Sequence, residues 1–307
     1  MSRRVGVVGL SESNGHPFSF SAIINGYDDA GLAASGWPGI HAYVRQRDRS
    51  EFGIDGLTVT HAWTQDPAIT AALCSACKIP NAAPDLATLA AEVDAVIIAR
   101  DDHESHYAMA MPLLEMGLPV FVDKPLTVDP GELTAFRPHL ESGQLMSCSG
   151  MRFARELDAP RATLADYGPL KLIRGAILND WEKYGVHLVD AMFNLTPARP
   201  VAVTALPARH SSLAVELDDG VLLQFDALGS TARCFRIDIF GERQHSTHEL
   251  VDNFSMFRRL LACWARGLEA GGPPISPADT LDSMRLLMMG RRAINEQRKV
   301  KLDEFPL

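Results

Sequence analysis

The sequence predicts an α/β protein in which a doubly wound parallel sheet is followed by an α+β domain with a mainly antiparallel sheet. Two observations lead to this prediction. Up to about residue 125, short apolar runs alternate with helical patterns. Beyond that point, runs of alternating hydrophobicity follow one another, and Asp219-Gly220 between two of them is a hairpin signal. At 307 residues the chain has the length of two domains. We expect a Rossmann-type domain at residues 1–125 and the second domain at residues 126–307.

The composition excludes several classes of protein. A formal net charge of −9 argues against a nucleic-acid partner and against an anionic membrane surface. No apolar run approaches the roughly 20 residues that span a bilayer. The N-terminus passes directly into a strand-like run without a cleavage-type segment. These features predict a cytoplasmic protein.

The five cysteines do not indicate a disulfide framework, because their number is odd and they are scattered along the chain. Cys74 and Cys77 form a Cys-x-x-Cys pair within a helical pattern. No second pair with the spacing of a zinc site follows nearby. We interpret them as two core residues of one helix and expect no metal site.

The first domain is expected to alternate strands and helices with short connections. Strands are predicted at residues 4–10, 57–63, 95–99 and 120–122. Helices are predicted at residues 17–27, 67–78, 85–92 and 107–117, the last kinked near Pro112 and closed by Gly117. The long polar segment 28–56 contains a short helical pattern, and its length indicates an insertion over the ligand crevice.

The turn after the first strand is a candidate phosphate-binding loop. Gly9 occupies the first glycine position of a dinucleotide fingerprint, but Ser11 and Asn14 stand at the other two, and Gly15 follows one residue late. Serine and asparagine are small, and asparagine tolerates left-handed backbone. With Pro17 at the start of the next helix, the turn can present N–H groups to an anion. The alternative is a plain strand-to-helix turn.

The end of the second strand leaves the choice between NAD and NADP open. A fold selective for NAD places an acidic residue there to bind the ribose hydroxyls. Asp66 is the acidic residue of this stretch, but it precedes Pro67, where it is better placed to cap the next helix.

The stretch VFVDKPL, residues 120–126, is the centre of the first domain. Ligands of an open α/β sheet bind beyond the carboxyl ends of its strands, so Lys124 is expected at the mouth of that crevice. Pro125 biases Lys124 toward an extended conformation, which can hold its side chain in one direction. The alternative is a solvated lysine after an edge strand.

The second domain is expected to contain short strands, two helical segments and then a sheet. The predicted strands are residues 147–153, 171–178, 200–209, 210–219, 220–229 and 234–242. The predicted helices are residues 155–167, 179–194, 254–270 and 277–297, and the last is a candidate to pack back on the first domain. One exposed sheet face predicts self-association into a homodimer or homotetramer through this sheet.

Several segments of the chain follow one another in a known order: a turn ending at His106, then VFVDKPLT, SGMRF, YGVHLVDAM and PPISPADTLDSMRLLMMGRRA. In this combination they resemble the Gfo/Idh/MocA family of glucose-fructose oxidoreductase and inositol dehydrogenase-like enzymes. VFVDKPLT resembles the family's strand ending in Glu-Lys-Pro, with Asp123 in place of glutamate. YGVHLVDAM resembles its Gly-x-His-x-x-Asp helix, which carries over to Gly185, His187 and Asp190.

This resemblance implies a Rossmann domain that binds NAD or NADP, with the nicotinamide near the Lys-Pro turn. The residues expected on the cofactor side are Gly9, Ser11, Asn14, Gly15, Arg100, Asp102, His103, His106, Asp123, Lys124 and Pro125. For His103 and His106 we expect a positioning role at the crevice edge and no metal.

The resemblance further implies that Lys124 hydrogen-bonds a reacting hydroxyl and that His187 takes or gives its proton. Hydride transfer from a carbinol carbon requires that proton to leave, and histidine titrates near neutral pH. Four residues before His187 the family often has an aspartate, where this chain has Lys183. Tyr184 is the candidate to supply an acid or a hydrogen bond instead.

The remaining substrate-side expectations concern Arg152, Trp181, Lys183 and Asp190. Arg152 is either an anchor for an anionic substrate group or an exposed surface arginine. Trp181 either stacks on a sugar ring or packs in the core.

Three functions follow from these patterns. The first is an NAD(P)-dependent oxidoreductase that transfers a hydride to or from a carbohydrate, polyol or nucleotide-sugar substrate. The second is a non-catalytic nucleotide-binding regulator or scaffold on the same fold, motivated by Lys183 and the irregular loop. The third is an enzyme that uses bound NAD transiently for epimerisation or elimination.

Overall fold

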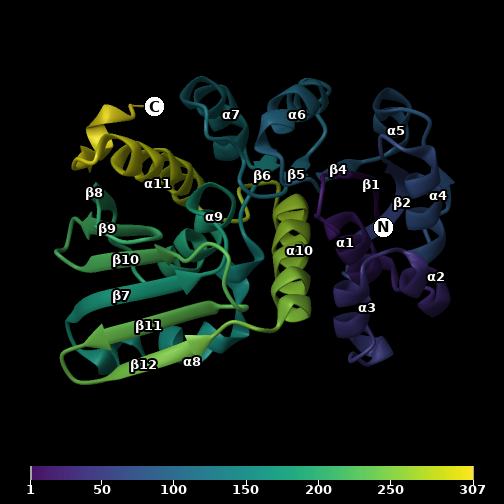
Figure 1. Cartoon of the computed structure of the whole chain (residues 1–307). Helices are drawn as coiled ribbons and strands as arrows, with labels where there is room; N and C mark the ends of the chain where they lie inside the picture. The colour runs from purple at the N-terminus through teal and green to yellow at the C-terminus, as the bar shows by residue number, and fades with distance from the viewer. Residues whose placement is uncertain (1, 307) are drawn as a thin grey trace. The chain divides into compact units, whose positions relative to one another are not determined.

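The computed structural model describes residues 2–306, which form two compact units with one sheet each (Figure 1). Unit 1 comprises Met1–Thr127, Phe136–Ser147 and Phe257–Pro277, and unit 2 comprises Val128–Ala135, Cys148–Met256 and Ala278–Leu307. The chain therefore returns to unit 1 twice after residue 127, where we expected a single boundary. The helix that joins unit 1 late in the chain is α10 (Asn253–Ala270), and the last helix, α11 (Pro277–Glu296), belongs to unit 2.

The sheet of unit 1 is parallel throughout, as predicted, with the order β3-β2-β1-β4-β5-β6. Its strands are β1 (Arg3–Val8), β2 (Leu57–Trp63), β3 (Asn81–Ala82), β4 (Ala95–Ile98), β5 (Val120–Val122) and β6 (Leu145–Met146). Val7, Ile97 and Phe121 on the central strands are fully buried, as expected for a parallel sheet covered on both faces. The strand order reverses between β1 and β4, which is where ligands bind in such sheets.

Four helices of unit 1 lie close to their predicted positions: α1 (His16–Asn25), α4 (Pro67–Ala76), α5 (Leu86–Glu92) and α6 (His106–Glu115). Two further helices, α2 (Asp29–Ala34) and α3 (Pro38–Val44), lie in the segment for which one short helix was expected. Helix α7 (Pro130–Ser142), whose second half belongs to unit 1, was not predicted. The segment 28–56, expected over the crevice, forms α2, α3 and the short helix η1 (Arg49–Glu51). It packs on α1 and α4, and Asp28 caps α2 by accepting the N–H of Gly31.

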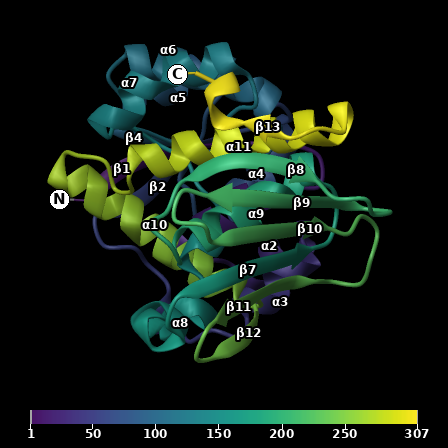
Figure 2. The same cartoon turned by 90° about the vertical axis from the view of Figure 1, so that its left-hand side faces the viewer.

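Unit 2 contains a seven-stranded sheet in the order β12-β11-β7-β10-β9-β8-β13 (Figure 2). Its strands are β7 (Leu170–Ile177), β8 (Pro200–Ala205), β9 (Ser211–Leu217), β10 (Leu222–Ala227), β11 (Phe235–Gly241), β12 (His245–Glu249) and β13 (Val300–Lys301). Only the pair of β7 and β10 is parallel among those described, so the sheet is mainly antiparallel, as predicted. Helix α9 (Trp181–Phe193) covers one face, and Figure 2 shows the strands from the other.

Three expectations for unit 2 were wrong. Residues 147–153 are not a strand, because Ser149 accepts the N–H of Met151 and starts a short helix, η3 (Gly150–Phe153). Residues 155–167 form three short helical pieces, η4 (Arg155–Leu157), α8 (Asp158–Ala162) and η5 (Leu164–Tyr167), where we expected one helix. Strand β12 was missed because its sequence, HSTHE, is polar, and its position is set by pairing with β11.

Trp181 lies in the core of unit 2, so core packing is its role and sugar stacking is not supported. The side chain is 2% exposed, its Nε1 donates to the carbonyl of Leu287, and its ring lies 5.5 Å from that of Phe225. Two helical glycines make room for it. A Cβ on Gly185 of α9 would lie 2.5 Å from Cε3 of the indole, and one on Gly290 of α11 would lie 2.4 Å from Nε1.

We predict that Gly185→Ala and Gly290→Ala each destabilise the protein by about 1–3 kcal/mol, because overpacking against a rigid ring outweighs the gain in helix propensity. Gly39→Ala in α3 is the matched control, since nothing lies within 4 Å of its added Cβ. That substitution should stabilise by about 0.5–1 kcal/mol. Urea unfolding of the three variants tests this. Stabilisation by Gly185→Ala would contradict the prediction, because it would show that the Trp181 ring moves to make room for the added methyl group.

Candidate active site

Three loops of unit 1 meet at the carboxyl ends of neighbouring strands. They follow β1, β4 and β5, which are adjacent in the sheet. Parallel strands end at the same edge, so loops that are distant in sequence come together there. The side-chain contacts among these loops define the candidate cofactor side of the site.

The loop after β1 is held in shape by its own polar side chains. Ser11 Oγ donates to Asp101 Oδ1 at 2.7 Å, and Asn14 Nδ2 donates to Asp123 Oδ2 at 3.2 Å. Asn14 Oδ1 also accepts the backbone N–H of His16 at the start of α1. Ser11 and Asn14, which stand where a fingerprint has glycines, therefore tie the loop to the ends of β4 and β5.

Both glycines of this loop are required by close packing. A Cβ on Gly9 would lie 2.4 Å from Cγ of Pro17, and one on Gly15 would lie 2.5 Å from Ile40 and 2.6 Å from the Trp37 ring. Any side chain at these positions would push α1 or α3 away from the loop.

The backbone of the loop fits a phosphate group. In residues 2–306, the N–H groups of Ser11, Glu12 and Ser13 have no hydrogen-bond acceptor. Such N–H groups at a strand-to-helix turn form a site for an anion. The loop thus has the free N–H groups that a pyrophosphate requires, and its role in binding the cofactor stays a prediction.

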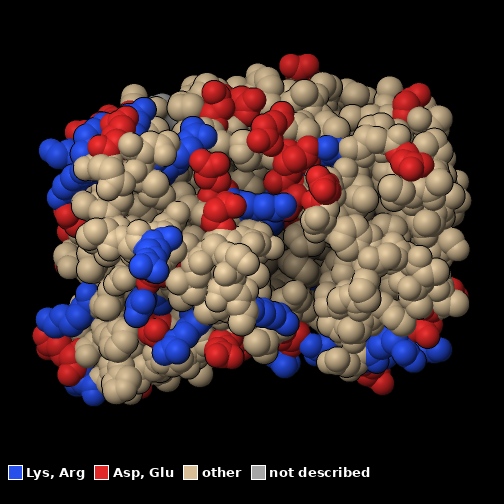
Figure 3. Space-filling model, in the orientation of Figure 1, with Lys and Arg blue, Asp and Glu red and all other residues tan. Residues whose placement is uncertain are grey.

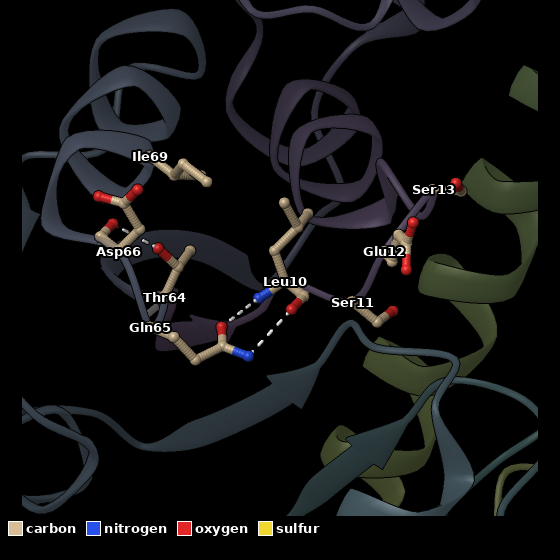
Figure 4. Close-up of a pocket in the computed structure, with 8 residues that line it drawn as sticks. All are labelled: Leu10, Ser11, Glu12, Ser13, Thr64, Gln65, Asp66 and Ile69. Atoms are coloured by element: carbon tan, nitrogen blue, oxygen red, sulfur yellow. Dashed lines mark hydrogen bonds between the residues drawn. The ribbon is translucent and has the colours of Figure 1, made fainter.

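A cavity of about 270 Å³ adjoins the loop at the end of β2 (Figure 4). It is lined by Leu10, Ser11, Glu12, Ser13, Thr64, Gln65, Asp66 and Ile69. The amide of Gln65 pairs with the backbone N–H and C=O of Leu10, at 2.7 and 3.0 Å (Figure 4). Asp66 accepts the N–H of Ala68 and caps α4, as predicted. In an NAD-binding fold this position receives the ribose of the adenosine half.

Asp123 is a buried charge that faces the protein interior. It is 2% exposed, and His16 Nδ1 lies 2.5 Å from its Oδ2. Burial alone would raise its pKa, but the charge and hydrogen bond of His16, helped by the charge of Lys124, lower the pKa to about 2. In this structure Asp123 supports the loop through His16 and Asn14. The direct cofactor contact expected for Asp123 stays a prediction.

Lys124 is buried beside a carboxylate, so the alternative of a solvated lysine is wrong. It is 4% exposed, and its Nζ lies 3.6 Å from Oδ2 of Asp101. The other oxygen of Asp101 accepts the hydrogen bond from Ser11. The ammonium is thus oriented at the ends of the strands by the same carboxylate that holds the phosphate loop.

The polar side chains of the turn after β4 form hydrogen bonds with other groups of the protein. Arg100 forms two hydrogen bonds with Asp102, at 2.9 and 2.5 Å. His106 is fully buried, and its ring nitrogens each lie 3.0 Å from a carbonyl oxygen, those of Leu126 and Arg100. Burial lowers the pKa of His106. Of these side chains, His106 joins the turn after β4 to the one after β5, whereas Arg100 and Asp102 pair within their own turn. The cofactor contacts expected for Arg100, Asp102 and His106 stay predictions.

His103 is the exception in that turn. It is partly exposed and lies 3.6 Å from Glu104, so its expected positioning role stays a prediction. Pro125, three residues after β5, is buried, and the cofactor contact expected for it stays a prediction.

In unit 2, His187 lies on a partly exposed face of α9. Tyr184 is one turn earlier on the same face, with ring centroids 5.3 Å apart. Ser149 Oγ lies 2.6 Å from Nδ1 of His187 and accepts the N–H of Met151. Because Ser149 is fully buried, this contact fixes the orientation of the imidazole ring.

Asp190 holds Ser149 in place through a hydrogen bond. It is 1% exposed, and it accepts the N–H of Ser149 at 2.5 Å and the hydroxyl of Ser283 at 2.7 Å. Burial raises its pKa although the charge of Arg152 acts in the opposite direction. Asp190 therefore positions Ser149 in this structure, and the substrate contact expected for it stays a prediction.

Arg152 is not the exposed surface arginine of the alternative prediction. It is 8% exposed and is paired through Nη2 with Asp279. Its Nη1 is buried without a hydrogen-bond partner in the described part of the chain. Lys183 is exposed, and its backbone N–H is accepted by Asp180, which caps α9. The substrate roles of Arg152 and Lys183 stay predictions.

The sequence did not single out Asp101, His16 or Ser149. None of the three is part of a recognisable motif in its local context, and the role of each depends on a partner far away in the sequence. Only Asp101 could have been found from the sequence, because it lies in the turn whose His106 matches the family motif. The other two are recognised only once the loops are brought together.

The comparisons with known proteins agree with this arrangement. Residues 30–147 match the model of an oxidoreductase family described as having an NAD-binding Rossmann fold. A protein of Amycolatopsis mediterranei that carries the provisional name UDP-kanosamine synthase oxidoreductase subunit is 28% identical over 144 residues. That match covers 46% of this chain and 38% of the relative, so the chain spans about two fifths of the length of the curated relative it matches.

Solved structures share the fold over the whole chain. The scyllo-inositol dehydrogenase from Lactobacillus casei, with bound NAD(H) and scyllo-inositol, has a TM-score of 0.76 and 13% identity, covering 99% of this chain and 100% of that one. The UDP-N-acetylglucosamine 3-dehydrogenase from Acidithiobacillus ferrooxidans has a TM-score of 0.70 and 15% identity, covering 97% and 99%. At these identities the likeness concerns the fold.

Unit 1 is thus an NAD-binding Rossmann domain. The family model that matches residues 30–147 is that of the Gfo/Idh/MocA oxidoreductases, which confirms the resemblance inferred from the sequence over that part of the chain. No helix in residues 2–306 has the length and apolar character to cross a membrane. Within the same residues no group of three or more His, Cys, Asp and Glu side chains is arranged to hold a metal ion.

We predict that Asp123 makes the stability of unit 1 sensitive to acid. The pKa of about 2 in the folded state lies below the unfolded value of about 3.9, so the stabilisation is present above pH 4 and is lost as the pH falls toward 2. Wild type should lose about 2 kcal/mol more than Asp123→Asn between about pH 5 and pH 2. Urea unfolding at a series of pH values measures this.

The matched control is Asp55→Asn, which removes an exposed carboxylate of the same unit. It should retain the pH dependence of the wild type. Equal loss of stability in Asp123→Asn and wild type would show that the charge of Asp123 contributes nothing to folding.

Proposed function

We propose that the protein is an NAD-dependent oxidoreductase that transfers a hydride to or from a CH–OH group of a carbohydrate, polyol or nucleotide sugar. The observation that carries the proposal is Lys124, whose buried ammonium is oriented by Asp101 at the strand ends of an NAD-binding domain. The substrates named for the two dehydrogenases of the same fold, an inositol and a UDP-sugar, support this class of substrate.

In this proposal the nicotinamide accepts or donates the hydride, and the protein handles the charge and the proton. Lys124 would polarise the reacting oxygen, because a desolvated ammonium stabilises developing negative charge strongly. Asp101 keeps that ammonium directed. Tyr184 is the candidate for a further hydrogen bond to the substrate, since it shares the exposed face of α9 with His187.

His187 would exchange the hydroxyl proton through Nε2. The hydroxyl of Ser149 can accept a hydrogen bond from Nδ1–H of the imidazolium and can rotate to donate to Nδ1 of the neutral ring. It therefore suits both protonation states that a general acid–base residue must adopt. Asp190 holds Ser149 in the position that this requires.

The cavity beside the loop favours NAD over NADP. Its lining includes the acidic residues Glu12 and Asp66 and contains no lysine or arginine. A 2′-phosphate on the ribose would meet negative charge without a basic partner, whereas NADP-selective sites supply an arginine.

We predict that His187→Gln lowers kcat by about 10²–10⁴-fold, as expected for loss of a general acid–base residue, with unchanged affinity for NADH. Ser149→Ala should lower kcat by about tenfold or more through misorientation of the ring, and Ser149→Thr should restore activity because it keeps the hydroxyl. Steady-state kinetics over a range of pH measures these effects. Full activity of Ser149→Ala in a folded protein would contradict the assigned role of Ser149.

We predict that NADH binds at least about tenfold more tightly than NADPH, a difference of about 1.4 kcal/mol. Glu12→Arg should reduce or reverse that preference by supplying a partner for the 2′-phosphate. Glu92→Arg, on the exposed surface of α5, makes the same charge change outside the cavity and should retain the preference. Fluorescence titration decides, and tighter binding of NADPH by the wild type would contradict the proposal.

We also propose self-association through the face of the unit 2 sheet that α9 leaves open. Leu222 and Phe240 lie on this face and are 36% and 37% exposed. Light scattering should show at least a dimer, and the double variant Leu222→Lys with Phe240→Glu should shift the mass toward the monomer. A monomeric wild type at working concentration would contradict this.

A further inference from the structure

Unit 1 contains a second and larger cavity, of about 770 Å³, which shares no lining residue with the cavity beside the phosphate loop. It is lined by Ile24, Asn25, Gly26, Tyr27, Asp28, Asp29, Arg45, Arg47, Arg49, Phe52, Gly53 and Lys78. These residues come from the end of α1, the start of α2, the segment after α3 and the turn after α4. Its volume is in the range of pockets that bind cofactors and other small molecules.

The cavity is separate from the phosphate loop. The loop lies at the first residues of α1, and the cavity lies at its last residues. Since α1 has 10 residues, the two are about 15 Å apart along the helix axis. A ligand in this cavity would not occupy the place of the nucleotide.

The lining is basic in a chain that carries a net charge of −9. It has four cationic side chains and two acidic ones. Figure 3 shows Lys and Arg side chains gathered at the lower edge of unit 1, over the region of α2 and α3 in Figure 1. The carbonyl end of α1 opposes an anion, but its equivalent of about half a charge is smaller than the excess of two cations.

The two acidic side chains of the lining already interact with groups of the protein. Oδ1 of Asp28 accepts the N–H of Gly31. Oδ1 of Asp29 lies 2.8 Å from Nε2 of His41 and 3.2 Å from Nε of Arg45. Both carboxylates thus organise α2 and α3, and a ligand would meet mainly the cations.

Arg49 and Lys78 are the cations best placed for a ligand. In the described part of the chain neither forms an ion pair. Lys78 Nζ lies over Gly26, 3.7 Å from where a Cβ would stand. Burial and the charge of Asp29 raise the pKa of Tyr27, and the charges of Arg45 and Arg49 act in the opposite direction.

An aromatic pair forms another part of the lining. The rings of Tyr27 and Phe52 lie 5.4 Å apart at an interplanar angle of 49°, and both residues are partly exposed. Exposed aromatic faces beside cations bind planar rings that carry negative charge, because stacking and charge pairing act together.

We propose that this cavity binds a small polyanion that carries a planar ring, of which a nucleoside triphosphate is the simplest representative. Arg49 and Lys78 would pair with the phosphates, and Tyr27 with Phe52 would contact the ring. The site is independent of the oxidoreductase function and would be retained if that function were wrong.

The test is calorimetric titration of the full-length protein, saturated with NADH so that the other cavity is filled. ATP, tripolyphosphate and adenosine are compared as ligands. ATP should bind most tightly, tripolyphosphate more weakly and adenosine most weakly. Failure of both ATP and tripolyphosphate to bind at millimolar concentration would overturn the proposal.

Variants locate the site. Arg49→Gln with Lys78→Gln should weaken ATP and tripolyphosphate binding by roughly tenfold for each cation removed. Phe52→Leu should weaken ATP alone. Arg266→Gln, an exposed arginine of α10 outside the cavity, is the matched control and should have no effect. Equal binding by the double variant and the control, with normal thermal unfolding of both, would place the ligand elsewhere and overturn the proposal.

Discussion

The crevice of unit 1 depends on the buried carboxylate of Asp123. It lies at the end of β5 and binds His16 and Asn14 from the loop after β1, so it joins the loop, the first helix and the central sheet. A carboxylate this deeply buried is stable only with a charged partner, and His16 with Lys124 provides that charge. Asp101 repeats the arrangement one strand away, between Ser11 and Lys124.

This arrangement explains how the loop can lack two of the three fingerprint glycines. In a glycine-rich loop, the backbone alone adopts the turn around the pyrophosphate. Here Ser11 and Asn14 bring side chains that tie the loop to the neighbouring strand ends, and the N–H groups of residues 11–13 keep their freedom to bind an anion. The irregular motif, which motivated the regulator hypothesis, is therefore compatible with cofactor binding.

The elements with a strong hydrophobic period were predictable, including strands β1, β2, β4 and β5 of unit 1, the hairpin at Asp219-Gly220 and helix α9. The two-residue edge strands β3 and β6 are too short to show such a period and were missed. Strand β12 was not predictable, because its residues are polar and its pairing is tertiary. The candidate site divides in the same way. Lys124 and the glycine loop stand out from local chemistry, whereas His106 and Asp190 match a motif and yet lie buried with backbone or serine partners. Sequence alone does not distinguish a residue that contacts a ligand from one that supports such a residue.

The most direct test of the account is hydride transfer itself. Wild type and Lys124→Ala would be titrated with NADH by fluorescence and then assayed with NAD and a panel of inositols, sugars and nucleotide sugars at the nicotinamide absorbance band. The account predicts that both proteins bind NADH and that only the wild type reduces NAD with a member of the panel. Turnover by Lys124→Ala at the wild-type rate would contradict the role of Lys124, and failure of the wild type to bind NADH would contradict the cofactor site on which the proposed function rests.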